Sequence, residues 1–216
     1  MTPRRTLFAL AAALSLVACS SPQTRYYTLI APLADAPGTA VQPAPFQFEM
    51  LPVLMPVQVD QPPLVVRQGN GSLAILDTER WGSPLGDEFH DALTAQLERR
   101  FGERDMAGLP KDSGRPLLSV RIDVRRFESL PGSYALSDVV WTLSLRDTGA
   151  IAGGKRQNLT CSSLIREDAS AGASGKGDAG SMDALILAHQ KAVSRLADDI
   201  AGTAARWARE QNARCR

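Results

Sequence analysis

The stretch LLSVRIDVRRFE, residues 117–128, alternates apolar and polar side chains with the two-residue period of a β-strand. Its apolar members share one face: Leu118, Val120, Ile122 and Val124. The same alternation continues in ALSDVVWTLSLRD (135–147) and QNLTCSSLIRED (157–168). Because each strand has one apolar and one polar face, the three predict an antiparallel sheet that is covered on a single side.

Shorter strand patterns precede this stretch. FQFEML (46–51) alternates, and YYTLI (26–30) predicts a short first strand. LVVRQGNGSLAIL (64–76) places Asn70-Gly71 between two apolar runs, and since both residues tolerate positive φ, a tight turn and a β-hairpin are predicted. The prolines within 52–63 interrupt regular pairing, so this segment is expected to wrap around the body.

Residues 83–102 have the strongest helical pattern. Ser83 is the expected N-cap, Pro84 suits the first helical position, and Gly102 is the expected stop. Apolar side chains recur every four residues and predict one buried face: Leu85, Phe89, Leu93 and Leu97.

A second helix is predicted for residues 182–210, with Ser181 as its N-cap. It follows 169–181, whose low complexity predicts a mobile segment. His189 falls on the apolar side of this helix, where a hydrogen-bonded residue at the core edge is expected more often than a ligand. The order strands, helix, strands, helix predicts an α+β fold, an antiparallel-dominated β-sheet with two main α-helices packed on one face.

The N-terminus has the features of a secretory signal peptide. Two arginines precede an uncharged apolar run, which is shorter than the roughly 20 residues that a membrane-spanning helix needs. Leu16-Val17-Ala18-Cys19 matches the bacterial lipobox, in which the cysteine is acylated and the chain is cut just before it. We therefore expect residues 1–18 to be removed, 19–25 to form a lipidated N-terminus and short tether, and 26–216 to form one domain. An ordinary signal peptide with a chance cysteine is the alternative.

Length and charge restrict the function of the mature chain. Loss of the signal peptide leaves 198 residues, enough for a single domain with its own core. It also removes two of the 24 basic residues, so that 22 stand against 23 acidic residues and the formal charge is −1. This balance argues against a nucleic-acid partner.

The residue after the lipobox cysteine bears on localisation. Ser20 after Cys19 favours the periplasmic face of the outer membrane, by a sorting rule known for some bacteria.

Two further cysteines, Cys161 and Cys215, would be exposed to an oxidising periplasm. A disulfide between them is predicted, with two free buried thiols as the alternative. The sequence has no CxxC motif and no Cys/His cluster, so no metal ion or other cofactor is expected.

The sequence carries no enzyme signature. The motifs GxSxG, HExxH and Walker A are absent. Of the two histidines, His90 stands beside Asp91 and is expected to be solvated, and His189 is expected at the core edge. We therefore expect no catalytic activity.

Several motifs together resemble a known family. Tyr26-Tyr27-Thr28-Leu29 follows the lipobox, and Glu79-Arg80-Trp81-Gly82-Ser83-Pro84-Leu85 leads from the hairpin into the first helix. Over residues 19–210 the chain is similar to the PqiC/YmbA-type lipoproteins, the auxiliary lipoprotein components of ABC-type transport systems. The resemblance implies a role with MCE-domain partners, which form rings or tubes for lipid traffic between the two membranes. It also implies a homo-oligomeric ring at the outer membrane that docks the partner and supports membrane integrity.

Five residues are candidates for a surface that contacts a partner or another subunit: Trp81, Leu51, Val53, Leu54 and Met55. Trp81 stands at the junction of hairpin and helix, where a buried lid on the first helix is the alternative. The other four lie in a proline-bracketed segment, which would otherwise wrap the core.

Two other functions remain open. One is a periplasmic lipoprotein that itself carries a lipid, and the other is an accessory lipoprotein of outer-membrane assembly or of the cell wall. A large internal apolar cavity would favour the carrier, whereas a solid core and a ring of subunits would favour docking.

Overall fold

The structure is a computed structural model that describes residues 23–32, 42–69, 71–146, 156–170, 178–210 and 214–215. Cys19, Asn70, the predicted signal peptide and most of the low-complexity segment lie outside these residues. The elements follow in this order: β1 (Arg25–Tyr27), β2 (Gln47–Met50), β3 (Pro63–Arg67), β4 (Leu73–Trp81), α2 (Leu85–Phe101), β5 (Leu117–Leu130), β6 (Tyr134–Arg146), β7 (Arg156–Asp168) and α3 (Asp178–Arg209).

The main sheet has the strand order β2-β5-β6-β7, and its last three strands are antiparallel neighbours. These are the three strands predicted from alternation. A β-bulge between Val124 and Arg126 shifts the register of β5 against β6. Beyond the bulge, Phe127 and Ser129 are the buried residues of β5. The extra residue therefore keeps Phe127 and Ser129 on the inner face, in continuation of the buried residues before the bulge.

Two strand pairs are parallel, which the alternating pattern did not predict. β2 pairs with β5 in the main sheet, and β1 pairs with β4 in a second sheet of order β1-β4-β3. Parallel neighbours need a long crossover connection, and the one between β2 and β5 contains α2. The α+β class and the dominance of antiparallel pairing are confirmed, but the described strands form two sheets instead of one, and each sheet contains one parallel pair.

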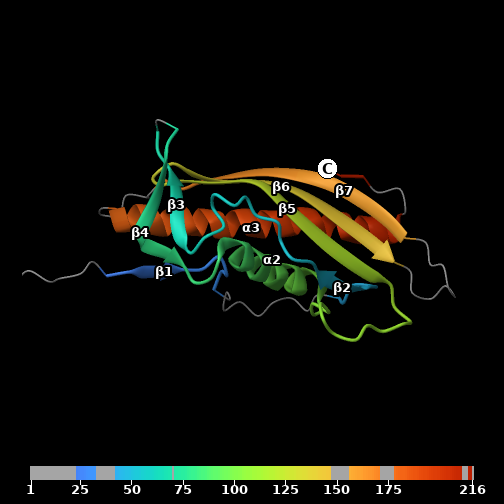
Figure 1. Cartoon of the computed structure of the whole chain (residues 1–216). Coiled ribbons are helices and arrows are strands. Elements are labelled where there is room, and N and C mark those ends of the chain that lie inside the picture. Colours follow the sequence, from blue (N-terminus) through green and yellow to red (C-terminus); the bar gives the residue numbers. More distant parts are fainter. Residues whose placement is uncertain are drawn as a thin grey trace, which may run out of the picture.

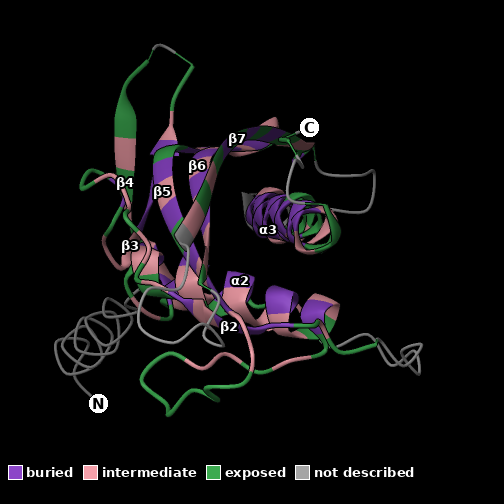
Figure 2. Cartoon of the chain, turned by 90° about the vertical axis from the view of Figure 1, so that its right-hand side faces the viewer, coloured by how far each residue is buried: buried purple, intermediate pink, exposed green. Residues whose placement is uncertain are grey.

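Both helices lie on the same side of the main sheet, as predicted (Figure 2). Figure 1 shows α3 running along the length of this sheet, with α2 beside it. The buried sides of the helices and the inner face of the sheet fill one core, which includes several fully buried side chains: Phe48, Phe89, Leu93, Leu118, Ile122, Leu143 and Leu185.

The helix ends match the prediction only in part. α2 ends as expected before Gly102, whose φ of 64° is left-handed. At its start Pro84 occupies the N-cap position without a side-chain cap, so Ser83 is not the cap. α3 begins at Asp178, which places the predicted cap Ser181 inside its first turn. A serine favours a helix start but does not determine it, because nearby partners compete for its hydroxyl.

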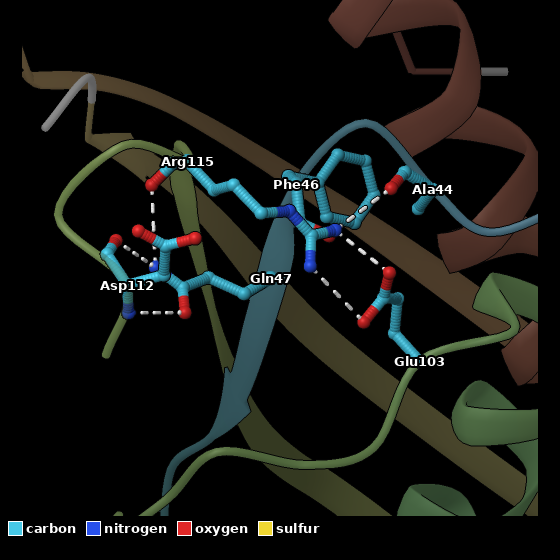
Figure 3. Close-up of polar contacts among 6 residues, drawn as sticks. All are labelled: Ala44, Phe46, Gln47, Glu103, Asp112 and Arg115. Carbon is cyan, nitrogen blue, oxygen red and sulfur yellow. Dashed lines mark hydrogen bonds and ion pairs between the residues drawn. The ribbon is translucent and has the colours of Figure 1, made fainter. Parts of the chain in front are cut away.

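The loop between α2 and β5 is fastened to β2 by side chains (Figure 3). The guanidinium of Arg115 donates to the backbone oxygen of Phe46 at 3.0 Å and pairs with Glu103 at 2.7 Å. The amide of Gln47 donates to the Asp112 oxygen at 2.7 Å and accepts from the Asp112 N–H at 3.0 Å. These bonds explain why Gln47 is buried although it alternates with apolar residues.

The predicted disulfide between Cys161 and Cys215 is present, with Cα atoms 5.6 Å apart. It holds the C-terminal end against β7, which is an edge strand of the main sheet. Among the described residues, no helix has the length and apolar character that crossing a membrane requires.

Replacing both cysteines by serine is expected to lower the free energy of unfolding by about 4 kcal/mol, because the bridge restricts the unfolded chain over a sequence separation of 54 residues. Urea unfolding of the wild-type protein and the double variant measures this difference. Reductant should destabilise the wild-type protein and leave the double variant unchanged. Recovery of free thiols at both positions from unreduced protein would contradict the bridge.

Candidate functional site

The two motifs that carry the family resemblance meet in the structure. β1 lies parallel to the end of β4, with Arg25 opposite Glu79 and Tyr27 opposite Trp81. The Arg25 guanidinium pairs with the Glu79 carboxylate at 2.6 Å, and the Gly82 N–H donates to the Tyr27 oxygen at 2.8 Å. We call the region formed by residues 25–29, 79–85 and Glu88 the anchor junction, because the chain enters the folded body here from the predicted lipid site.

A buried carboxylate lies at the centre of the anchor junction. Glu88, in the first turn of α2, is 7% exposed. Its Oε2 accepts from the Thr28 hydroxyl at 2.8 Å and from the Leu29 N–H at 3.0 Å. Its Oε1 accepts from the Ser83 hydroxyl at 3.3 Å. One side chain therefore joins the chain after β1 to the connection between β4 and α2.

Gly82 leaves room for this carboxylate. A Cβ atom at this position would lie 2.9 Å from Glu88 Oε1, so the Glu88 side chain would have to shift. α3 closes the junction from another side, since the Gln190 amide donates to the Thr28 oxygen at 3.0 Å. The junction therefore draws on both helices and on the second sheet.

Trp81 is only 2% exposed, so it does not form part of a contact surface. Its ring packs edge-on against Phe127 and His189, with centroid distances of 6.3 Å to each. The prediction that Trp81 belongs to a partner surface is therefore corrected, because its large apolar ring is stabilised by burial against the core. The alternative, a buried residue at the junction of hairpin and helix, describes its position.

His189 lies within the core and not at its edge. Its ring stacks on Phe127 at 4.2 Å, and its Nε2 is 2.9 Å from the Ser129 hydroxyl. Burial lowers the pKa of His189 to about 3, so the imidazole is neutral at physiological pH. The serine and the histidine are both buried, so this pair is closed to a substrate in the described conformation. His90, by contrast, is partly exposed and lies 3.0 Å from Asp91.

The proline-bracketed segment is only partly a surface. Leu54 is 54% exposed, whereas the side chains of Leu51, Val53 and Met55 are half-buried. Backbone bonds fix Leu54 beside β5, since its N–H donates to the Ile122 oxygen at 3.1 Å. The segment thus both wraps the core and exposes one leucine.

The exposed apolar residues extend beyond the predicted set. Val57, three residues after Leu54, is 83% exposed, and Leu73 and Ile75 on β4 are also exposed. Leu73 and Ile75 alternate with less exposed residues, so the two-residue period was the signal for an outward face. The sequence gives no comparable signal for Val57, because it lies in an irregular segment. No cluster of three or more His, Cys, Asp or Glu side chains suited to a metal ion occurs within the described ranges.

Replacing Glu88 by glutamine is expected to lower the free energy of unfolding by about 1 to 3 kcal/mol, because an amide cannot accept all three hydrogen bonds and a buried donor loses its partner. Asp87→Asn is the matched control, since Asp87 is exposed in the same helical turn. Chemical denaturation of both variants measures the difference. Equal effects of the two substitutions would contradict a special role of Glu88.

Stability is expected to fall below pH 6.5 because of His189. The folded protein holds its pKa near 3, whereas the unfolded chain binds a proton near pH 6.5, so acid favours unfolding. This contribution is complete above pH 6.5 and is lost towards pH 3, by up to about 1.4 kcal/mol per pH unit. Chemical denaturation of the wild-type protein and of His189→Gln at pH 7, 6 and 5 measures how much of the pH dependence of stability comes from His189. An unchanged pH slope in the variant would contradict the assignment.

Comparison with known proteins agrees with this arrangement. A family model described as ABC-type transport auxiliary lipoprotein component matches residues 27–201. None of the curated proteins matches the chain.

Two solved structures share the fold. One, described as an uncharacterized protein, has 15% sequence identity and a TM-score of 0.56, over 83% of this chain and 99% of its own. The other, a protein of Xanthomonas campestris, has 16% identity and a TM-score of 0.54, over 87% of this chain and 98% of its own. At such identities these two structures support the fold alone. The family match, which includes most of the anchor junction, of the core and of both helices, shows that the chain belongs to the ABC-type transport auxiliary lipoprotein components.

Proposed function

We propose that this protein is an outer-membrane lipoprotein subunit of an MCE-type intermembrane lipid transport system, where a ring of its copies docks and supports the periplasm-spanning partner. The family match supports the general function, an auxiliary component of an ABC-type transporter. The more specific docking role is supported by the attachment of the N-terminal strand to the folded body close to the predicted lipid site.

The distance from lipid to folded body is short. β1 begins at Arg25, six residues after Cys19, and an extended chain of that length spans at most about 20 Å. Arg25 is itself held by Glu79, and Thr28 and Leu29 are held by Glu88. A body fixed this closely to its anchor suits a docking platform at the membrane surface and does not suit a carrier that must travel.

The interior also favours docking over lipid carriage. Side chains of α2, α3 and the main sheet fill the space between the layers, and many of them are fully buried. The clefts found among the described residues open to the surface and have volumes of about 270 to 360 Å³. None of these is an enclosed apolar chamber of the kind that a lipid carrier needs. Leu54 and Val57 offer exposed apolar contacts for a neighbouring subunit or partner.

Replacing Cys19 by alanine is expected to move the protein from the outer-membrane fraction to the soluble periplasmic fraction, because the lipid is its membrane attachment. Density-gradient fractionation and immunoblotting measure this. Circular dichroism of the released protein should match that of the wild-type body, since the described contacts begin beyond Cys19. A variant that stays in the outer membrane would contradict the anchor.

The docking role requires a second measurement on the same samples. Wild-type protein captured from mildly solubilised membranes should co-purify an MCE-domain protein and be oligomeric by light scattering. Recovery of wild-type protein in the inner membrane, or as a monomer without an MCE-domain protein, would contradict the proposed function.

A further inference from the structure

A cleft of about 270 Å³ lies where the β3–β4 hairpin meets β5. Its floor is apolar and well buried, formed by Val59, Val65 and Phe127. Three arginines line it: Arg67, Arg125 and Arg126. We call it the arginine cleft. It shares no lining residue with the anchor junction, and the proposed docking role makes no use of it.

The hairpin supplies one wall through its strand alternation. Val65 and Arg67 lie on the same face of β3, and their partners on β4 are Ile75 and Leu73. Leu73 also lines the cleft and is 52% exposed, so an apolar side chain stands at its mouth. The cleft therefore combines an apolar interior with a cationic rim.

The β-bulge supplies the other wall. In a regular strand, Arg125 and Arg126 would point to opposite faces of the sheet. The register shift between Val124 and Arg126 lets both consecutive arginines line the same cleft. Bulges commonly re-aim side chains beside functional sites, and here the result is a concentration of guanidinium groups.

Positive charge exceeds negative charge around the cleft. Glu128 is shared by two arginines, through Oε1 at 2.9 Å from Arg67 and 2.8 Å from Arg126. Arg125 pairs with Asp123 at 3.1 Å. Three arginines therefore face two carboxylates. Each of these ion pairs joins a carboxylate oxygen to one nitrogen of the arginine. A guanidinium has five N–H donors, so donors remain for an anion at the cleft.

We propose that the arginine cleft binds a phosphate group of net negative charge, together with the first carbon atoms of an apolar chain where the phosphate carries one. Guanidinium groups bind phosphate oxygens with paired hydrogen bonds, which a single carboxylate neighbour does not exhaust. The floor of valines and phenylalanine binds the carbon atoms next to the phosphate. The volume holds a headgroup and the first carbons of a chain but not a whole phospholipid. The phosphate comes either from an anionic lipid headgroup or from free phosphate.

The test uses the full chain with Cys19→Ala, which has no lipid of its own. Dihexanoyl phosphatidylglycerol, below its micelle concentration, is titrated into the protein and followed by ¹H–¹⁵N spectra of the arginine Nε–H groups. Saturable shifts of Arg67, Arg125 and Arg126 are expected. Dihexanoyl phosphatidylcholine, which has the same chains but no net charge, should bind at least about tenfold more weakly, and added salt should weaken both.

Variants separate the cleft from general surface charge. Arg125→Gln with Arg126→Gln should weaken binding of the anionic lipid at least about tenfold. Arg121→Gln is the matched control, because Arg121 is exposed on the same strand outside the cleft and should leave affinity unchanged. If the double variant does not fold, Arg125→Gln alone should still weaken binding, since Arg125 keeps only an exposed pair with Asp123.

The outcomes distinguish the two sources. Tighter binding of the anionic lipid than of inorganic phosphate assigns the cleft to a lipid headgroup, and equal binding assigns it to free phosphate. Absence of saturable shifts with both probes, equal affinity for the two lipids, or unchanged affinity in the double variant would overturn the proposal. None of these results depends on whether an MCE-domain protein co-purifies, so failure here leaves the docking role standing.

Discussion

The carboxylate of Glu88 is the interaction on which the placement of the N-terminal strand depends. β1 has only three paired residues, and a strand pair of that length has little stability by itself. Three donors from separate segments converge on Glu88: the Thr28 hydroxyl, the Leu29 N–H and the Ser83 hydroxyl. Because the carboxylate lies in the first turn of α2, it also meets the favourable end of the helix dipole. The chain after β1 is thereby joined to α2, which contributes one face to the core.

Elements with a regular period were predictable, and long-range pairings were not. The alternation in β5, β6 and β7 reflects burial of one face, so it can be read locally. The parallel partners of β1 and β2 are brought together by connections of many residues, which leave no local pattern. Ser83 shows why local rules also fail at helix ends. It was a good N-cap by type, but its hydroxyl is directed to Glu88, and Pro84 takes the capping position.

The site was predictable in its motifs but not in its geometry. The early tyrosine motif and the segment around Trp81 were recognised separately, and only the fold reveals that they are adjacent. Burial of Trp81 reverses its expected role, because a junction of sheet and helix has no outer face there. The arginine cleft could not be foreseen at all. Arg67 lies far in sequence from Arg125 and Arg126, and the bulge that aligns the latter two is invisible in an otherwise alternating strand.

Three packed rings explain why a tryptophan at the end of β4 belongs in the core. Trp81 pairs with Tyr27 within the anchor junction, and its ring packs edge-on against Phe127 and His189. Phe127 in turn forms the floor of the arginine cleft and stacks on His189. The tethered end of the chain and the cleft therefore share one wall of close-packed side chains. Since packed interiors deform little, the cleft keeps a fixed orientation relative to β1, the first strand after the predicted lipid site.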